Sequence, residues 1–150
     1  MRVNDSTDPA DVHDAPDGTG PCAGAGPCRP ADVRRAVRRA VTGRCAGGGC
    51  PYDEAALSDA LLVASELTTN AILHGGGVTA FDVDLDGRSV RVSVSDRSDR
   101  MPVAVDPLDE QGRTRVHGRG WPIVCRLARD VRVSDMPCGG KRITAVVPVF

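Results

Sequence analysis

Three polar residues at four-residue spacing lie inside the longest helical pattern of the chain. Glu66, Asn70 and His74 share one face of a helix predicted over residues 54–74, and three glycines follow it. Another face carries the mostly apolar set that a helix needs to pack on a sheet: Leu57, Leu61, Ala64, Thr68, Ala71 and Ile72. Burial of a carboxylate and a carboxamide without partners is costly. Glu66 and Asn70 are therefore expected to face solvent, or else to face a cleft that binds a partner or a ligand.

After the glycines the pattern changes from helical to alternating. Apolar residues alternate with polar ones over residues 81–85 and 90–94, which predicts two antiparallel strands with an Asp-Gly turn between them. Asp96 lies two residues beyond Val94, so a continued strand directs its carboxylate toward the covered side, where it needs a hydrogen-bond donor. The alternative is an aspartate that turns into solvent or caps a turn.

A short glycine motif precedes the last helical pattern. Gly118, Arg119 and Gly120 stand before an apolar pattern that predicts a helix near 119–128. The first turn of a helix presents unpaired backbone N–H groups and a partial positive charge, which suit a phosphate. A Gly-x-Gly segment is also common in ordinary turns, and Arg119 would equally suit an exposed position.

Taken in order, three motifs resemble one nucleotide-binding family. They are E-L-x-x-N-A-x-x-H-G from Glu66, D-x-S-x-x-x-P from Asp96 and G-R-G from Gly118. Together they resemble the ATP-binding family shared by gyrase, histidine kinases and MutL, and the nearest branch looks like the small anti-sigma-factor serine kinases of bacteria. The resemblance covers about residues 31–149, and the combination is far more specific than any single motif.

The resemblance and the periodicity together predict an α/β two-layer sandwich of the Bergerat type. The expected sheet is mostly antiparallel and four-stranded, with two further strands near residues 131–133 and 143–149. One face of it is expected to be covered by helices near 31–43, 54–74 and 119–128.

The resemblance implies a site for ATP and Mg²⁺. Its phosphate end would consist of Asn70, which helps hold Mg²⁺ on the phosphates, with Gly118, Arg119 and Gly120 as the phosphate seat. Glu66 would be the general base that deprotonates a serine hydroxyl of a protein substrate.

At the base end, the resemblance implies that Asp96 accepts a hydrogen bond from the exocyclic amine of adenine. Ser98 stands where the broad family has glycine, as is familiar in the anti-sigma-like branch. Related chains commonly have G-K-T in the last turn and strand, whereas residues 140–142 here read G-K-R. Thr144, which shares a strand face with residue 142, is the candidate to replace the threonine that supports the adenine site.

Residues 1–30 and 99–117 show no clear helical or strand periodicity. Residues 1–30 are rich in Asp, Gly and Pro and poor in large apolar side chains, which predicts a disordered N-terminal tail before a domain over residues 31–150. Residues 99–117 have few periodic apolar positions, which suits a lid over a nucleotide or a plain surface loop.

Length and composition limit the class of protein to which this chain can belong. The 150 residues suit one domain, and the net charge of −1 does not favour non-specific polyanion binding. The sequence has neither an 18-residue apolar run nor a charged, apolar leader, so we expect a cytoplasmic protein without a membrane span. The pairs Cys22/Cys28 and Cys45/Cys50 lack C-x-x-C spacing, so no structural metal is expected, and Cys125 suits an ordinary buried thiol.

Three functions compete. The first is an ATP-dependent serine/threonine kinase that acts on an anti-sigma antagonist protein. The second is an ATP-binding module that sequesters a sigma factor or other partner with little or no turnover. Glu66 favours the kinase. The family more often has Leu and Thr where this chain has Trp121 and Arg142, and these departures keep the binding module as an alternative. DNA binding through the arginines of residues 34–39 is least favoured because the net charge is slightly negative and aromatic residues are few. A homodimer is compatible with the sequence.

Overall fold

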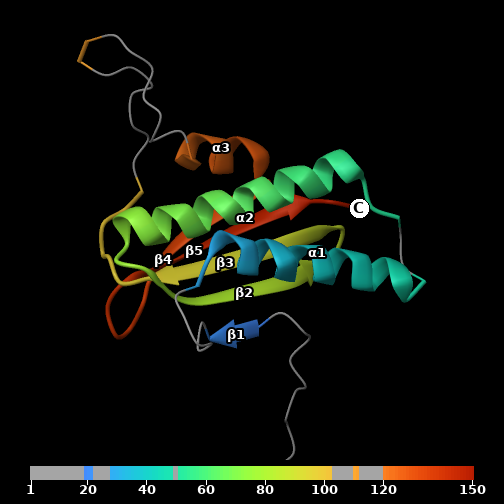
Figure 1. Ribbon diagram of the computed structural model, residues 1–150, viewed down its shortest axis with the longest axis horizontal. Helices are drawn as coiled ribbons and strands as arrows, with labels where there is room; N and C mark the ends of the chain where they lie inside the picture. The colour runs from blue at the N-terminus through green and yellow to red at the C-terminus, as the bar shows by residue number, and fades with distance from the viewer. Residues whose placement is uncertain (1–18, 22–27, 49–50, 103–109, 112–119) are drawn as a thin grey trace, which may run out of the picture.

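A computed structural model describes residues 19–21, 28–48, 51–102, 110–111 and 120–150. Within these residues the chain forms one antiparallel sheet and three helices that lie on one side of it (Figure 1). The helices are α1 (Pro30–Ala46), α2 (Glu54–His74) and α3 (Gly120–Leu127). The strands are β1 (Thr19–Pro21), β2 (Val78–Asp86), β3 (Ser89–Asp96), β4 (Asp130–Asp135) and β5 (Lys141–Pro148), in the order β1-β2-β3-β5-β4.

The predicted α/β two-layer sandwich is confirmed, and the sheet has one short strand more than the four expected. The additional strand, β1, pairs antiparallel with the edge of β2 and comes from the segment predicted as a disordered tail. Three residues are too few to produce an alternating pattern in the sequence, so periodicity could not reveal this strand. Most of residues 1–30 lies outside the described residues, and the disordered tail therefore remains a prediction.

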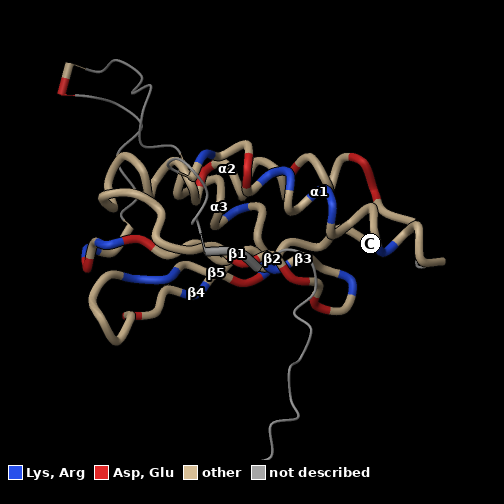
Figure 2. The backbone as a smooth tube through the Cα atoms, turned by 60° about the horizontal axis from the view of Figure 1, so that its bottom comes forward, with Lys and Arg blue, Asp and Glu red and all other residues tan. Residues whose placement is uncertain are grey.

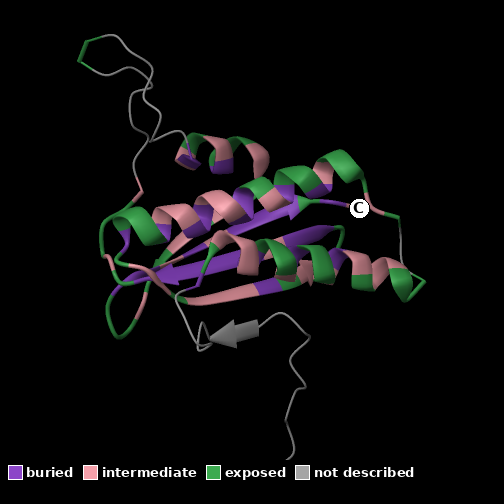
Figure 3. Ribbon diagram, in the orientation of Figure 1, coloured by how far each residue is buried: buried purple, intermediate pink, exposed green. Residues whose placement is uncertain are grey.

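The core lies between the sheet and the helices. Val33, Val37 and Val41 of α1 are fully buried, as their spacing predicts, and the central strands are buried along most of their length (Figure 3). Of the stripe predicted for α2, Leu57, Ala64, Thr68 and Ala71 are buried and Leu61 is half-buried, whereas Ile72 is 41% exposed. The buried stripe instead ends at Ala71, and the next residue lies about 100° further round a helix of 3.6 residues per turn.

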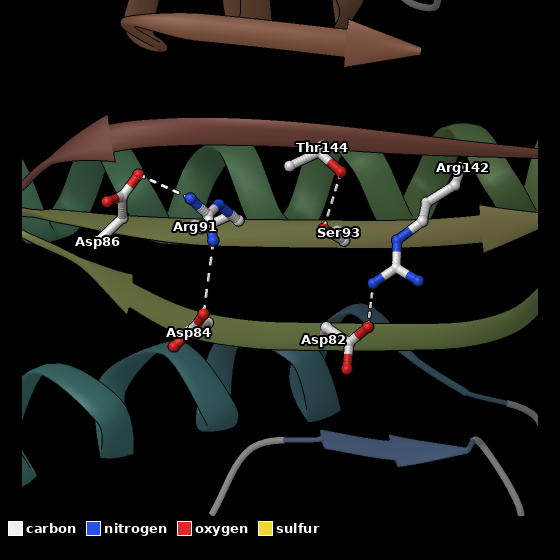
Figure 4. Close-up of polar contacts among 7 residues, drawn as sticks. All are labelled: Asp82, Asp84, Asp86, Arg91, Ser93, Arg142 and Thr144. Carbon is white, nitrogen blue, oxygen red and sulfur yellow. Dashed lines mark hydrogen bonds and ion pairs between the residues drawn. The ribbon is translucent and has the colours of Figure 1, made fainter. Parts of the chain in front are cut away.

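Alternation along the strands leaves a polar face on the side of the sheet away from the helices (Figure 4). Arg91 of β3 lies 3.5 Å from Asp84 and 2.8 Å from Asp86 of β2. Arg142 of β5 pairs with Asp82 across β3 on the same face. Ion pairs therefore connect β2 to β3 and to β5 on the helix-free side of the sheet.

Charged residues are also numerous on α1, as Figure 2 shows. Arg34, Arg35, Arg38 and Arg39 are all exposed, in agreement with a solvated face. Arg34 donates a hydrogen bond to Ser65 Oγ of α2 at 3.0 Å, and so joins the two helices.

The prediction for Cys125 can be compared with the structure, whereas Cys22 and Cys50 lie outside the described residues. Cys125 is exposed, so the prediction of a buried thiol is wrong; its neighbour Val124 is buried instead. The described residues contain no group of three or more His, Cys, Asp or Glu side chains placed to hold a metal ion. None of the helices in the described part of the chain is long and apolar enough to span a membrane.

Candidate functional site

The first end of the candidate site forms where α3 begins against the middle of α2. Glu66 and Asn70 are half-buried and one turn apart on α2, as their spacing predicts, whereas His74 is exposed. Gly120, the first residue of α3, lies directly against both side chains: a β-carbon on Gly120 would overlap Oε2 of Glu66 and lie 3.5 Å from Oδ1 of Asn70. Glycine is therefore the residue that lets α3 begin this close to the two polar groups.

The electrostatics of this end suit an anion together with a cation. The start of α3 carries the partial positive charge of a helix N-terminus and free backbone N–H groups, which favour a phosphate. The side chains of Glu66 and Asn70 form no hydrogen bond or ion pair with other residues in the described part of the chain. Carboxylate and amide oxygens are the hard ligands that Mg²⁺ prefers. Gly118 and Arg119, the other predicted residues of this end, lie outside the described residues.

The second end lies at the C-terminal end of α2, where β3 ends and β5 begins (Figure 1). Asp96 is 4% exposed, so its side chain points to the covered side as predicted. The donors that it needs come from the chain: Lys141 Nζ lies 3.0 Å from Oδ1 and 2.9 Å from Oδ2, and the Ser98 backbone N–H donates to Oδ1 at 2.9 Å. The carboxylate is thus held by a buried ion pair.

Lys141 is the residue of this end that the sequence reasoning missed. Its side chain is 7% exposed, and its ammonium also donates to the Ser98 carbonyl at 3.3 Å. The signal was present in the alternation, because residue 141 shares a strand face with the buried residues Ile143, Ala145 and Val147. Lysine is so seldom fully buried without a partner that the pattern alone did not suggest it.

Two glycines enclose Asp96. A β-carbon at Gly75, the residue after α2, would overlap the Asp96 carboxylate, and one at Gly140 would overlap its carbonyl oxygen. Gly140 also has a φ of +81°, which side chains rarely adopt, and its N–H donates to Asp99 Oδ1 at 2.8 Å. The approach of both loops to Asp96 therefore requires glycine.

Thr144 does not join Asp96. It lies on the helix-free face, with its Oγ1 2.8 Å from Oγ of Ser93 (Figure 4). Arg142 is on the same face and bonds to Asp82, so its side chain does not enter the space beside Asp96. The physical reason is register: Lys141 is the partner opposite Asp96, and the residues at 142 and 144 alternate to the other side of β5. Of the predicted residues at this end, the structure brings together Asp96 and Ser98.

One rigid element connects the two ends. Gly75 lies nine positions after Glu66, which corresponds to about 14 Å along the helix axis at 1.5 Å per residue. A ligand that touches both ends must therefore be elongated, with an anionic end near Gly120 and another group near Asp96. Most of residues 99–117, the segment predicted to be a lid, lies outside the described residues.

Comparison with known proteins adds a finding that the geometry alone does not supply. The family model for the histidine kinase-like ATPase domain matches residues 26–147, a range that contains both ends of the site. No curated protein matches the chain.

Proposed function

We propose, from the premise that this chain belongs to the histidine kinase-like ATPase family, that it is an ATP-binding regulatory protein with serine/threonine kinase activity. The substrate in this proposal is a serine of an anti-sigma antagonist protein, with Mg²⁺ as the accompanying cation. The family match supports ATP binding; the kinase activity rests on the residues of the site.

The residues at the start of α3 fit a magnesium-bound triphosphate. Asn70, whose Oδ1 lies close to Gly120, offers an amide oxygen to the cation, and the first N–H groups of α3 would hold a phosphate. When bound, ATP supplies the phosphoryl group that is transferred. Asp96 and the adjoining Ser98 would hold the base at the other end of α2, while Gly118 and Arg119 would complete the phosphate seat.

Glu66 has the properties of a general base in this arrangement. Its carboxylate lies at the same helix N-terminus as the proposed phosphate seat and is bound to no other described residue. A serine hydroxyl brought to this point could donate a hydrogen bond to Glu66, which would orient it and accept its proton during transfer. The observation that carries the proposal is the packing of Gly120 against both Glu66 and Asn70.

The test uses ATP labelled on its γ-phosphate, Mg²⁺ and candidate antagonist proteins. Asn70→Ala should lose both nucleotide binding and phosphotransfer, because the metal-bound phosphates lose an anchor. Glu66→Ala should bind ATP nearly as the wild type does and transfer phosphate about 10²- to 10⁴-fold more slowly, the usual contribution of a positioned base. Asp59→Ala is a suitable control, since Asp59 is an exposed acid on the same helix.

Two results would contradict the proposal in different ways. If the Glu66→Ala protein phosphorylates its partner at the wild-type rate, Glu66 is not the general base. A wild-type protein that binds ATP but phosphorylates no tested antagonist would favour the second candidate function, a module that sequesters a sigma factor or other partner with little turnover.

A further inference from the structure

The outer side of α1 concentrates positive charge that neither the core nor the proposed ATP site uses. α1 contains five arginines and one aspartate, a net charge of +4, whereas the whole chain has a net charge of −1. At about 100° per residue, four of these arginines lie on one side of the helix, away from the buried valines. All four are exposed: Arg34, Arg35, Arg38 and Arg39.

These arginines have few anions of their own. Arg35 lies 3.7 Å from Asp32, but the side chains of Arg38 and Arg39 form no ion pair or hydrogen bond with other residues that the structure describes. Arg34 and Arg38 stand four positions apart, as do Arg35 and Arg39. Like charges at that spacing repel each other and weaken a helix. An anionic partner would remove this repulsion.

The same surface continues on α2 as an exposed apolar ridge. Arg34 donates a hydrogen bond to Ser65 at 3.0 Å, which places this side of α2 beside α1. Glu66 lies about 100° further round the helix and faces the start of α3. Between these two directions lie Leu62 and Leu73, whose exposed fractions are 40% and 57%. The proposed general base therefore stands at the edge of a surface that has leucines next to it and arginines beyond them.

We propose that the protein whose serine is phosphorylated docks on this outer surface of α1 and α2. The docking surface consists of Arg34, Arg35, Arg38, Arg39, Leu62 and Leu73. The inference rests on the proposed function, and it gives the partner a chemistry: an acidic segment with apolar side chains beside its carboxylates. A guanidinium binds a carboxylate through two parallel N–H donors, and the leucines gain from contact with an apolar partner that excludes water.

The position of the docking surface suits its role. Leu62 precedes Glu66 by one helical turn, about 6 Å along the axis. A segment that contacts Leu62 thus holds its neighbouring residues close to the proposed base. Such positioning lowers the entropy that transfer must otherwise overcome.

A protein segment fits this surface better than a nucleic acid or a membrane does. Glu54 and Asp59 of α2 are exposed and would repel a phosphate backbone that extends past the arginines. Leu62 and Leu73 have no apolar counterpart on such a backbone. An anionic membrane is bound by a helix whose free face is itself apolar, whereas the apolar face of α1 is buried in the core.

The first measurement is the fluorescence anisotropy of a labelled peptide with glutamates on one helical face and leucines beside them. A length of about 20 residues allows appreciable helix. The comparison probes are the same peptide with lysine in place of every glutamate, a duplex DNA of about 20 base pairs, and phosphatidylserine vesicles. We expect the wild type to bind the glutamate peptide most tightly, and salt to weaken that binding because it screens exposed charges.

Two substitutions divide the surface into its charged and apolar parts. Arg38→Glu should weaken binding of the glutamate peptide at least about 10-fold, because it places a like charge opposite the carboxylates. Leu62→Ser should weaken it about 3- to 10-fold through lost apolar contact. Arg132→Glu is the matched control: it makes the same charge change at an exposed position of β4, on the helix-free face, and should leave the affinity within about twofold.

Kinetics connect docking with phosphate transfer. The substrate is the antagonist protein that the wild type phosphorylates fastest in the assay of the proposed function. Arg38→Glu should raise the KM for this protein at least about 10-fold and leave kcat within about twofold, because docking stabilises ground state and transition state alike. Glu66→Ala, by contrast, should lower kcat. Calorimetry should show wild-type affinity of Arg38→Glu for Mg-ATP.

The outcomes separate the inference from the proposal beneath it. The inference is overturned if the wild type does not bind the glutamate peptide, or binds the DNA or the vesicles more tightly. Equal peptide affinities of the wild type and Arg38→Glu would also overturn it, as would a variant that loses kcat at unchanged KM. A wild type that binds the glutamate peptide as expected but phosphorylates no antagonist supports the docking surface and refutes the kinase activity.

Discussion

Two aspartate–cation pairs connect strands of the sheet, one between the neighbours β3 and β5 and the other from β2 to β5 across β3, and they lie on opposite faces. Asp96 and Lys141 lie between the sheet and the helices with side chains 4% and 7% exposed. Asp82 and Arg142 lie on the opposite face with side chains 28% and 35% exposed. Since Lys141 and Arg142 are consecutive in β5, strand alternation alone sends one cation into the interior and the next toward solvent.

The comparison shows that the strand face on which an ion pair lies, rather than the charges themselves, determines how much its loss costs in stability. A half-exposed pair gains little, because water and salt screen it and both side chains lose freedom. Formation of a buried pair removes two charges from water. A substitution that removes only one partner therefore leaves the other charge unpaired in the interior. The helix-free face thus tolerates change, whereas the covered face does not.

The largest expected effect is on the buried pair. Lys141→Met should lower the free energy of unfolding by about 3–5 kcal/mol, because it leaves the Asp96 carboxylate unpaired in the interior. The double variant with Asp96→Asn should recover most of that loss, since no charge is then stranded. Urea unfolding at neutral pH measures both values, and a loss below about 1 kcal/mol for the single variant would contradict the contrast between the two pairs.

A smaller effect is expected from crowding the same carboxylate. Gly75 does not have a positive φ, so alanine fits its backbone, yet the added β-carbon would overlap Asp96. Gly75→Ala should therefore cost about 1–3 kcal/mol of unfolding free energy through overpacking. Gly43→Ala is the matched control in α1, where nothing lies within 4 Å of the new carbon; it should stabilise the helix by up to about 1 kcal/mol. Equal effects of the two substitutions would show that Asp96 is not confined by Gly75.

The smallest effect is expected on the helix-free face. Arg142→Met breaks the pair with Asp82 and should change the unfolding free energy by no more than about 1 kcal/mol. The same urea titration measures it, and 1 M salt should reduce the difference further because it screens exposed charges. A loss as large as that of Lys141→Met would erase the distinction between the faces.

Much of the fold could be predicted because helices and strands repeat with different periods. The helix at residues 54–74 and the hairpin that follows agree with the structure. The errors at Ile72 and Cys125 share one cause: each follows a buried helical residue by one position, so a small error in the stripe exposes it. The strand β1 is too short to show a period at all.

The candidate site was less predictable, because its contacts join residues far apart in the chain. Glu66 and Asn70 could be assigned to one face from spacing alone, but the approach of Gly120 depends on how α3 packs on α2. Lys141 was missed because its place directly opposite Asp96 depends on strand register. Thr144 was placed with Asp96 although alternation with the buried Ile143 and Ala145 puts it on the other face of β5. Alternation reveals which residues share a face, but not the register.

The central claim is that the start of α3 and the polar residues of α2 together bind Mg-ATP. Calorimetric titration of wild-type protein and Gly120→Ala with Mg-ATP tests it most directly, because Gly120 has no positive φ and the added β-carbon would displace Glu66 Oε2 while the rest of the fold is left in place. The account predicts saturable binding by the wild type and affinity at least about 10-fold weaker in Gly120→Ala, a difference of about 1.4 kcal/mol or more. Equal affinity in the two proteins, or no binding by the wild type, would contradict it.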